Sequence, residues 1–215
     1  MAAGDGVIDS AAELAVVADR MGVAIDLAVA ERIEDYLALL HKWNQTYNLT
    51  AVRNLPEMRL RHALDALAVL PWIEPDVPLA DVGSGPGIPG IILALARPTL
   101  PVTLIDSNLK MTRFAQAAVQ ALALDQVTVQ RARVEALPPG QYGQIISRAF
   151  AATGDFLRWT EALGTPSARW LAMKGRLDPA EQAAVPPVFA LQQVQPLAIP
   201  GLDAARHLLI YQRAR

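Results

Sequence analysis

The stretch Asp81-Val-Gly83-Ser-Gly85-Pro-Gly87-Ile-Pro89-Gly90 lies between a short apolar run at 79–82 and an apolar segment of helix length at 89–96. Read from Gly85, it matches the G-x-G-x-x-G pattern of a strand, a glycine-rich turn and a helix. Glycine has no Cβ, so such a turn lets the backbone approach a ligand closely. The stretch predicts the first β–α turn of a Rossmann-like sheet, with a ligand held beside it.

Short apolar or β-branched runs recur after this turn, separated by segments of helix length. They predict parallel strands at 79–82, 102–105, 127–129, 144–147 and 169–173, followed by a helix at 179–185. Two last runs, 189–197 and 207–212, have no helix between them and therefore predict an antiparallel pair at one sheet edge. The alternation indicates an α/β fold with a seven-stranded, mostly parallel sheet.

The residues before the sheet predict three helices. Ser10 and Glu13 form a capping box for the first helix, which Gly22 closes, and a stripe of apolar residues at spacings of three and four marks the second, ending near Asn48. The third begins at Asn54 and stops before Pro71. We therefore expect a helical extension, residues 1–70, packed on an α/β domain, residues 71–215, as a single compact unit. The acidic start, to about residue 9, is expected to be disordered.

Composition excludes several classes of protein. The chain has 215 residues, a net charge of −2 and no cysteine, which removes disulfides, thiolate metal sites and sulfur nucleophiles, and no metal is expected. Its apolar runs are far shorter than the roughly 18 residues of a membrane span, and no leader pattern opens the chain, so we expect a cytoplasmic protein without a membrane partner. A nucleic-acid partner would need a local basic patch.

The glycine loop favours one cofactor over another. Asp81 lies two residues before the first glycine, and Pro86 and Pro89 remove amides that a pyrophosphate would bind, so a nicotinamide dinucleotide fits poorly. S-adenosylmethionine has a cationic sulfonium and an α-amino group but no phosphate, so it favours an acid there. Asp106, about 20 residues on, is then placed to accept both ribose hydroxyls. Val134 and Glu135, after the third strand, are expected to border the adenine.

The residues also restrict the methyl acceptor. Methylation of pyrimidine carbon-5 usually needs a cysteine nucleophile, which this chain lacks. Exocyclic amine methylation usually carries an Asn/Asp/Ser-Pro-Pro-aromatic loop after the fourth strand, where this chain reads Ile146-Ser-Arg148-Ala-Phe150. The remaining acceptors have a free lone pair: a purine ring nitrogen, or an oxygen or nitrogen of a small molecule.

Several residues near the strand ends are candidates for RNA contacts. Arg148 is predicted at the carboxyl end of the fourth strand, where a guanidinium could bind guanine O6 or a phosphate. Trp43 and Tyr47 could stack on bases, but their helical spacing favours core packing. The other candidates are Asn44, Asn48, Arg59, Arg61, His62, Lys110, Arg113 and Lys174.

Five ordered motifs together resemble the RsmG (GidB) family of bacterial methyltransferases. They are Leu40-His-Lys-Trp-Asn44-Gln-Thr-Tyr-Asn48-Leu-Thr50, Arg61-His62, the glycine loop, Ile146-Ser-Arg-Ala-Phe150 and Met173-Lys-Gly175. The resemblance covers about residues 26–211 and implies a Rossmann-like class I methyltransferase that uses S-adenosylmethionine. It further implies methylation of one guanosine at N7 in 16S ribosomal RNA, within the 30S subunit or an assembly intermediate. We expect a monomer.

The resemblance also assigns residues. The family's cofactor contacts fall on Gly83, Ile88, Val134, Glu135 and Arg148, and the physical argument adds Gly85, Gly87 and Asp106. Guanine N7 carries no proton, so direct in-line transfer needs no general base and no covalent intermediate. We expect Arg148 and Lys174 to act as catalytic residues near the base or a phosphate. The rival hypotheses are a small-molecule methyltransferase, a non-catalytic module that binds S-adenosylmethionine or the ribosome, and a nicotinamide oxidoreductase.

Overall fold

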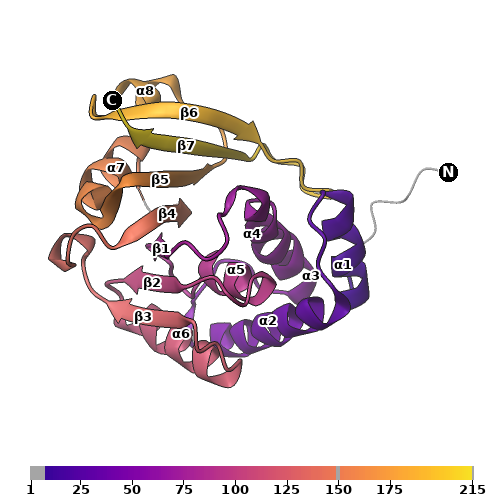
Figure 1. Cartoon of the computed structure of the whole chain (residues 1–215). Coiled ribbons are helices and arrows are strands. Elements are labelled where there is room, and N and C mark those ends of the chain that lie inside the picture. Colours follow the sequence, from indigo (N-terminus) through magenta and orange to yellow (C-terminus); the bar gives the residue numbers. More distant parts are fainter. Residues whose placement is uncertain (1–7, 149–150, 215) are drawn as a thin grey trace.

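A computed structural model describes residues 8–148 and 151–214; residues 1–7, most of the start expected to be disordered, lie outside the described residues. Its centre is a seven-stranded sheet of order β3-β2-β1-β4-β5-β7-β6 (Figure 1). The strands are β1 (Leu79–Val82), β2 (Val102–Asp106), β3 (Val127–Arg131), β4 (Tyr142–Arg148), β5 (Gly164–Lys174), β6 (Phe189–Pro196) and β7 (His207–Arg213). β1 to β5 pair in parallel, and β7 lies antiparallel to both β5 and β6. The predicted fold class is confirmed.

Helices cover both faces of the sheet (Figure 1). The helices before the sheet are α1 (Ala11–Arg20), α2 (Leu27–Tyr47), α3 (Leu55–Met58), the π-helical turn η1 (Arg59–Leu64), α4 (Asp65–Leu67) and the 3₁₀ turn η2 (Leu70–Trp72). Those between the strands are α5 (Gly90–Ala96), α6 (Leu109–Ala121), η3 (Val134–Ala136), α7 (Thr153–Thr160), η4 (Glu161–Leu163) and α8 (Pro179–Ala183). No helix of the described residues is long and apolar enough to cross a membrane.

Side chains point alternately to the two faces of the sheet along each strand, so the hydrophobic core has two parts, one on each face. On one face, Leu79, Leu104 and Leu171 pack with the apolar residues of α1, α2, α4, α5 and α6. On the other, their neighbours such as Ala80, Ile105 and Trp170 pack with α7. Successive strand residues point to opposite faces, so each buried strand supplies both layers. The first 70 residues therefore share one continuous hydrophobic core with the sheet.

The local signals for the N-terminal helices act as expected, with two refinements. Ser10 caps α1 by accepting from the Glu13 amide at 3.2 Å, but the Glu13 carboxylate accepts from the Asp9 amide, one residue earlier than the capping box predicts. Asn54 caps α3, accepting from the Glu57 amide at 2.9 Å. The predicted third helix is interrupted by the π turn η1, whose Arg59 makes a forked ion pair with Glu34 of α2, at 2.7 and 2.9 Å.

Two predictions from the pattern differ from the structure. β5 begins at Gly164, five residues before the predicted 169, because Gly164 pairs with Tyr142 across a bulge in the β4–β5 ladder. The aromatic stripe of α2 is only partly core: Trp43 is half-buried against Phe114, whereas Tyr47 is 48 % exposed and contacts Trp43 at a tilt, with ring centroids 5.4 Å apart. The core-packing interpretation is therefore wrong for Tyr47, because α2 extends past the edge of the core.

Candidate active site at the carboxyl ends of the strands

The glycine loop 83–90 is held open by its own backbone. Gly83, Gly85 and Gly87 have φ angles of +66°, +55° and +97°, in the left-handed region that only glycine adopts freely. The amide of Gly83 donates to the carbonyl of Ile105 at 2.9 Å, and the amide of Gly85 donates to Asp106 Oδ2 at 2.9 Å. The loop is thus tied to the end of β2, and open space remains beside Gly85.

Asp81 is the buried acid beneath this loop. Its Oδ2 accepts from the Gly90 amide at 2.7 Å, while its buried Oδ1 has no hydrogen-bond partner among the described residues. Burial raises the pKa of Asp81 to about 7, although the Gly90 amide and the Arg148 charge both lower it and Asp106 raises it further. An unpaired buried carboxylate oxygen is costly. The α-ammonium of S-adenosylmethionine would satisfy it, so the residues present fit that cofactor.

Gly90 is a site where a methyl group has no room. A Cβ at Gly90 would meet the Leu104 side chain and come within 2.9 Å of Asp81 Oδ2. We expect Gly90→Ala to lower the free energy of unfolding by about 2 kcal/mol, through overpacking, and Tm by several degrees. Thermal denaturation checks this, with Gly175→Ala as the matched control, since a Cβ there meets nothing closer than 3.8 Å. Equal Tm values for the two variants would contradict the prediction.

The helical extension supports the loop directly. Tyr36 of α2 is fully buried, and its hydroxyl donates to the Pro86 carbonyl at 3.0 Å. Burial raises the pKa of Tyr36, so the hydroxyl keeps the proton that it donates to this carbonyl. A residue 50 positions before the loop therefore fixes the conformation of its middle.

Two cavities meet at Gly83. The first, of about 430 Å³, is lined by four of the predicted cofactor residues, Gly83, Asp106, Val134 and Glu135, together with Trp159 of α7. Asp106 is half-buried, and each of its oxygens accepts one backbone amide: Oδ2 from Gly85, and Oδ1 from Asn108 at 2.8 Å. A carboxylate has about four lone-pair positions, so it can still accept two hydroxyls.

The second cavity, of about 540 Å³, lies over the ends of β4 and β5. Its walls include the predicted cofactor residues Gly83, Gly85, Ile88 and Arg148 and the predicted RNA or catalytic residues Arg61, His62 and Lys174. Gly87 lines neither cavity. Its Cα lies against the Ile91 side chain, which a Cβ at this position would meet. The structure thus brings the predicted cofactor residues other than Gly87 to two adjoining spaces. Their contacts with a bound cofactor stay predictions.

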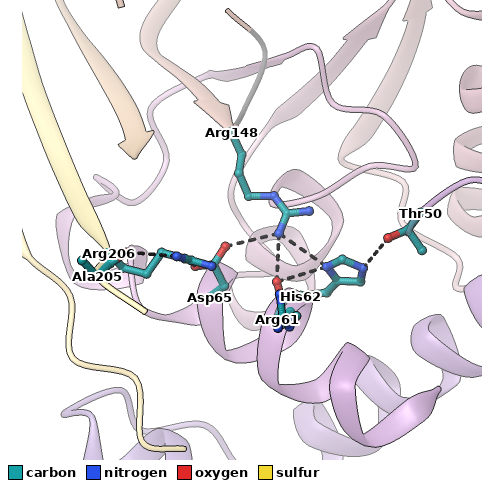
Figure 2. Close-up of polar contacts among 7 residues, drawn as sticks. All are labelled: Thr50, Arg61, His62, Asp65, Arg148, Ala205 and Arg206. Atoms are coloured by element: carbon teal, nitrogen blue, oxygen red, sulfur yellow. Dashed lines mark hydrogen bonds and ion pairs between the residues drawn. The ribbon is translucent and has the colours of Figure 1, made fainter. Parts of the chain in front are cut away.

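Arg148 is the centre of a polar network on the wall of the second cavity. Figure 2 shows its Nη1 directed at η1 and α4, where it donates to the Arg61 carbonyl at 2.9 Å and to Asp65 Oδ2 at 3.2 Å. Arg206 reaches the other oxygen of Asp65, with Nε 3.1 Å from Oδ1. The Nη2 of Arg148 has no partner among the described residues. One end of the guanidinium is therefore anchored, and the other is available to a ligand.

His62 completes the wall as a neutral imidazole. Its Nε2 lies 2.9 Å from Thr50 Oγ1, and its Nδ1 lies 3.1 Å from the Arg61 carbonyl and 3.4 Å from Arg148 Nη1. Burial, followed by the charge of Arg148, lowers the pKa of His62 to about 4. His62 therefore carries no charge at neutral pH and links the 49–52 loop to Arg148.

The other predicted residues differ in how available they are. Lys174 lines the cavity, but its ammonium pairs with Glu181 at 2.8 Å and donates to the Ala151 carbonyl at 3.1 Å. An acid of α8 thus partly neutralises the charge of Lys174, and the pairing lowers the pKa of Glu181. Asn44 is 2 % exposed, and both ends of its amide bond the 50–52 backbone, at 2.9 Å each, so it shapes this loop from inside instead of offering a surface to RNA.

Three further RNA candidates, with Arg61, lie on the surface around this end of the sheet. Asn48 ends α2 in a left-handed conformation, and its carbonyl accepts from Lys110 Nζ at 3.0 Å. Arg113, one turn after Lys110 on α6, is exposed. Arg61 is half-exposed and pairs with Glu57 at 2.9 Å. No group of three or more possible metal ligands occurs among the residues that the structure describes.

Sequence reasoning missed Asp65 and Arg206, which orient Arg148. One signal could have found Arg206: β7 is antiparallel, so the residue before it lies at the same edge as the end of β5, and His207 indeed pairs with Lys174. Asp65 gives no such signal, because an acid one turn after Arg61 is normally read as its helical partner.

The fold and site define a class of protein: Rossmann-like methyltransferases that depend on S-adenosylmethionine. The magnesium protoporphyrin IX methyltransferase of Synechocystis, solved with S-adenosylmethionine bound, superposes with a TM-score of 0.60 at 16 % identity over 83 % of this chain and 97 % of that one. A methyltransferase of the same dependence from Aquifex aeolicus gives 0.56 at 18 % identity, over 72 % and 92 %. These identities show the fold alone.

The chain belongs to the GidB family, described as rRNA small subunit methyltransferase G, whose model matches residues 29–209. Ribosomal RNA small subunit methyltransferase G of Pseudomonas aeruginosa is 47 % identical over 202 residues, which are 94 % of each chain. The protein of that name from Pseudomonas entomophila is 47 % identical over 206 residues, 94 % of this chain and 95 % of its own. The resemblance drawn from the five motifs is confirmed.

Proposed function

We propose that this chain transfers a methyl group from S-adenosylmethionine to N7 of one guanosine in 16S ribosomal RNA. The observation that carries the proposal is the pair of cavities that meet at Gly83 beneath the glycine loop, with Arg148 on the wall of the second. Family membership supports a ribosomal RNA substrate and the S-adenosylmethionine cofactor. The lone pair of N7 fits the acceptor class that the missing cysteine and the 146–150 motif leave open.

The residues of the first cavity would hold the cofactor together with the glycine loop, and with Ile88 and Arg148 of the second cavity. Asp106 would accept the ribose hydroxyls, Val134 and Glu135 would border the adenine, and Gly83, Gly85 and Gly87 would let the backbone approach the amino-acid chain. Asp81 would pair with its ammonium through the unpaired Oδ1. When bound, the cofactor supplies an electrophilic methyl group. N7 carries no proton, so the chain's task is to align the guanine and exclude water, without a general base.

The residues of the second cavity would hold the guanosine. The free Nη2 of Arg148 is a donor suited to guanine O6 or to a phosphate, while Asp65 holds Nη1 in place. Lys174 lies at the same wall and adds a positive charge, which its ion pair with Glu181 partly neutralises. Asn48, Lys110, Arg113 and Arg61 would contact flanking RNA, and Asn44 and His62 would support the loop behind them.

The raised pKa of Asp81 makes cofactor binding depend on pH. Only the ionised carboxylate pairs with an ammonium, so affinity should rise as the pH passes about 7. We expect S-adenosylhomocysteine to bind about tenfold more weakly at pH 6 than at pH 8. Without ligand the native state holds this proton more tightly than the unfolded chain, so the free energy of unfolding should fall as the pH rises from about 4 to about 7.

Isothermal calorimetry across this pH range checks the prediction. Asp81→Asn is the control, which should bind weakly and equally at both pH values. His62 does not interfere, because its pKa of about 4 lies below the range. An unchanged pH dependence in Asp81→Asn would assign the titration to another group.

The reaction itself is tested by methyl transfer to 30S particles from cells that lack this modification. Radiolabelled S-adenosylmethionine is used, and the RNA is then digested to nucleosides and separated. We expect label in 7-methylguanosine, with transfer by a monomer acting in the cytoplasm on the 30S subunit or an assembly intermediate. Label in another nucleoside would refute the N7 proposal, and no label despite cofactor binding would refute the RNA substrate. Comparing 30S particles with deproteinised RNA, and sedimentation of the enzyme, tests the form of the substrate and the oligomeric state.

A further inference from the structure

A groove of about 1050 Å³ lies beside the second cavity and outside the candidate active site. It is bounded by the end of α1, by Trp72 of η2, by the turn after β5 and by the 196–206 loop that joins β6 to β7. This volume lies just above the range of pockets that enclose drug-sized ligands, about 300 to 1,000 Å³. Its size favours an extended ligand over a small molecule.

The groove continues into the candidate active site. Gly175, Leu197 and Arg206 line both the groove and the second cavity. Arg206 stands at the junction: its Nε pairs with Asp65, the same carboxylate that orients Arg148. Figure 2 shows Arg206 and Arg148 approaching Asp65 from different sides. A ligand that fills the second cavity can therefore extend into the groove without leaving the protein surface.

The charges in the groove come from segments far apart in the sequence. Arg20 ends α1, Arg176 follows β5 and Arg206 precedes β7, and all three line the groove. Arg20 and Arg176 are exposed, and neither side chain has a partner among the described residues. Asp203 is the acid among the residues lining the groove. Three guanidinium groups therefore line one groove with unused hydrogen-bond donors, an arrangement that suits binding to successive phosphates of a nucleic-acid strand.

We propose that this groove binds the sugar-phosphate backbone of the RNA strand that flanks the target guanosine, with Arg20 and Arg176 as phosphate contacts. The inference rests on the proposed function for the identity of the RNA. It adds a substrate path beside β5 and β7, whereas Lys110 and Arg113 lie on α6, which follows β2 at the other end of the strand order. Phosphate contacts position a strand without reading its sequence, which suits a single modified nucleotide whose own base lies in the cavity.

The first test compares Arg20→Ala/Arg176→Ala with the wild type in methyl transfer to undermethylated 30S particles. The control is Lys42→Ala/Arg158→Ala, which removes the same charge at exposed positions that line none of the three cavities. We expect KM for the particle to rise about tenfold at 0.15 M salt in the groove variant, with kcat and S-adenosylhomocysteine affinity within twofold. The log–log salt dependence should weaken by about 0.7 for each lost phosphate contact, about 1.4 in total. Equal KM values for the groove and control variants would overturn the proposal.

The second test identifies the occupant. A photo-crosslinking benzoylphenylalanine replaces Ala198, which is exposed and lines the groove, and in a control protein it replaces Arg158. We expect crosslinks to 16S ribosomal RNA from position 198 and none from position 158. Crosslinks from position 198 to a ribosomal protein alone would overturn the RNA assignment. This test needs no methyl transfer, so a failed reaction with RNA crosslinks would refute the proposed function while the groove still binds RNA.

Discussion

Replacing Arg148 with alanine should lower kcat/KM for methyl transfer by about 10² to 10³-fold, the range found when one oriented donor near the reacting atoms is removed. Asp65 and the Arg61 carbonyl hold Nη1, so the rest of the guanidinium is presented to the cavity in one orientation. Single-turnover transfer to 30S particles measures the loss. Activity within twofold of the wild type would show that Arg148 is an ordinary ion-pair residue.

The variant also leaves Asp65 with one partner fewer, which must be separated from catalysis. The Asp65 side chain is only 5 % exposed, so losing Arg148 destabilises the fold as well. Arg206 still pairs with Asp65 in the single variant. Arg148→Ala/Asp65→Asn removes the buried carboxylate charge altogether and should restore Tm but not activity. Arg148→Lys keeps the charge but lacks the fork, so it should remain well below the wild type. Recovery of transfer in the double variant would mean that the defect was one of stability.

Replacing Asp106 with alanine should weaken S-adenosylhomocysteine binding by at least 100-fold. Two hydroxyls that donate to a charged acceptor contribute about 1.5 to 3 kcal/mol each, which corresponds to a factor of at least 10² together. Calorimetry measures the affinity, and near-normal binding would refute the ribose role. The same carboxylate also holds the Gly85 and Asn108 amides, so part of the loss could come from the loop.

A ligand change separates these two causes. The 2′,3′-dideoxy analogue of S-adenosylhomocysteine should bind the wild type much more weakly than the parent compound. With Asp106→Asn, which keeps the size of the side chain, the ratio of the two affinities should shrink toward one if Asp106 contacts the ribose. A ratio equal to that of the wild type would place the role of Asp106 in the loop alone.

The elements that the sequence predicted depend on neighbours in the chain. Ser10 and Asn54 cap helices by bonding amides three residues away, and the glycine loop needs its φ angles whatever packs around it. The strands also followed from short runs, although the start of β5 did not, because Gly164 joins the sheet through Tyr142, 22 positions earlier. Local chemistry therefore sufficed for the order and kind of the elements.

Only part of the candidate site could be predicted from the sequence. Residues at strand ends, such as Asp106 and Arg148, could be placed at the site because parallel strands end at one edge of a sheet. Side-chain partners could not be placed: Arg148 meets Asp65 across 83 positions, and Arg206 meets the same carboxylate across 141. The pairing of Lys174 with Glu181 and the burial of Asn44 could not be predicted either, since each depends on how a loop packs.

The residue types and their spacings alone determined three things: the Rossmann-like class, a cofactor without phosphate and the exclusion of a cysteine nucleophile. Each follows from chemistry within a single motif or from the absence of a residue type. Tertiary structure alone decided which cations are already paired with acids and which keep free donors. Lys174 is paired, Arg148 keeps one end free, and Arg20 and Arg176, ordinary surface arginines by sequence, face one groove. Charge is a property of the residue, but its availability depends on what the fold brings within about 4 Å.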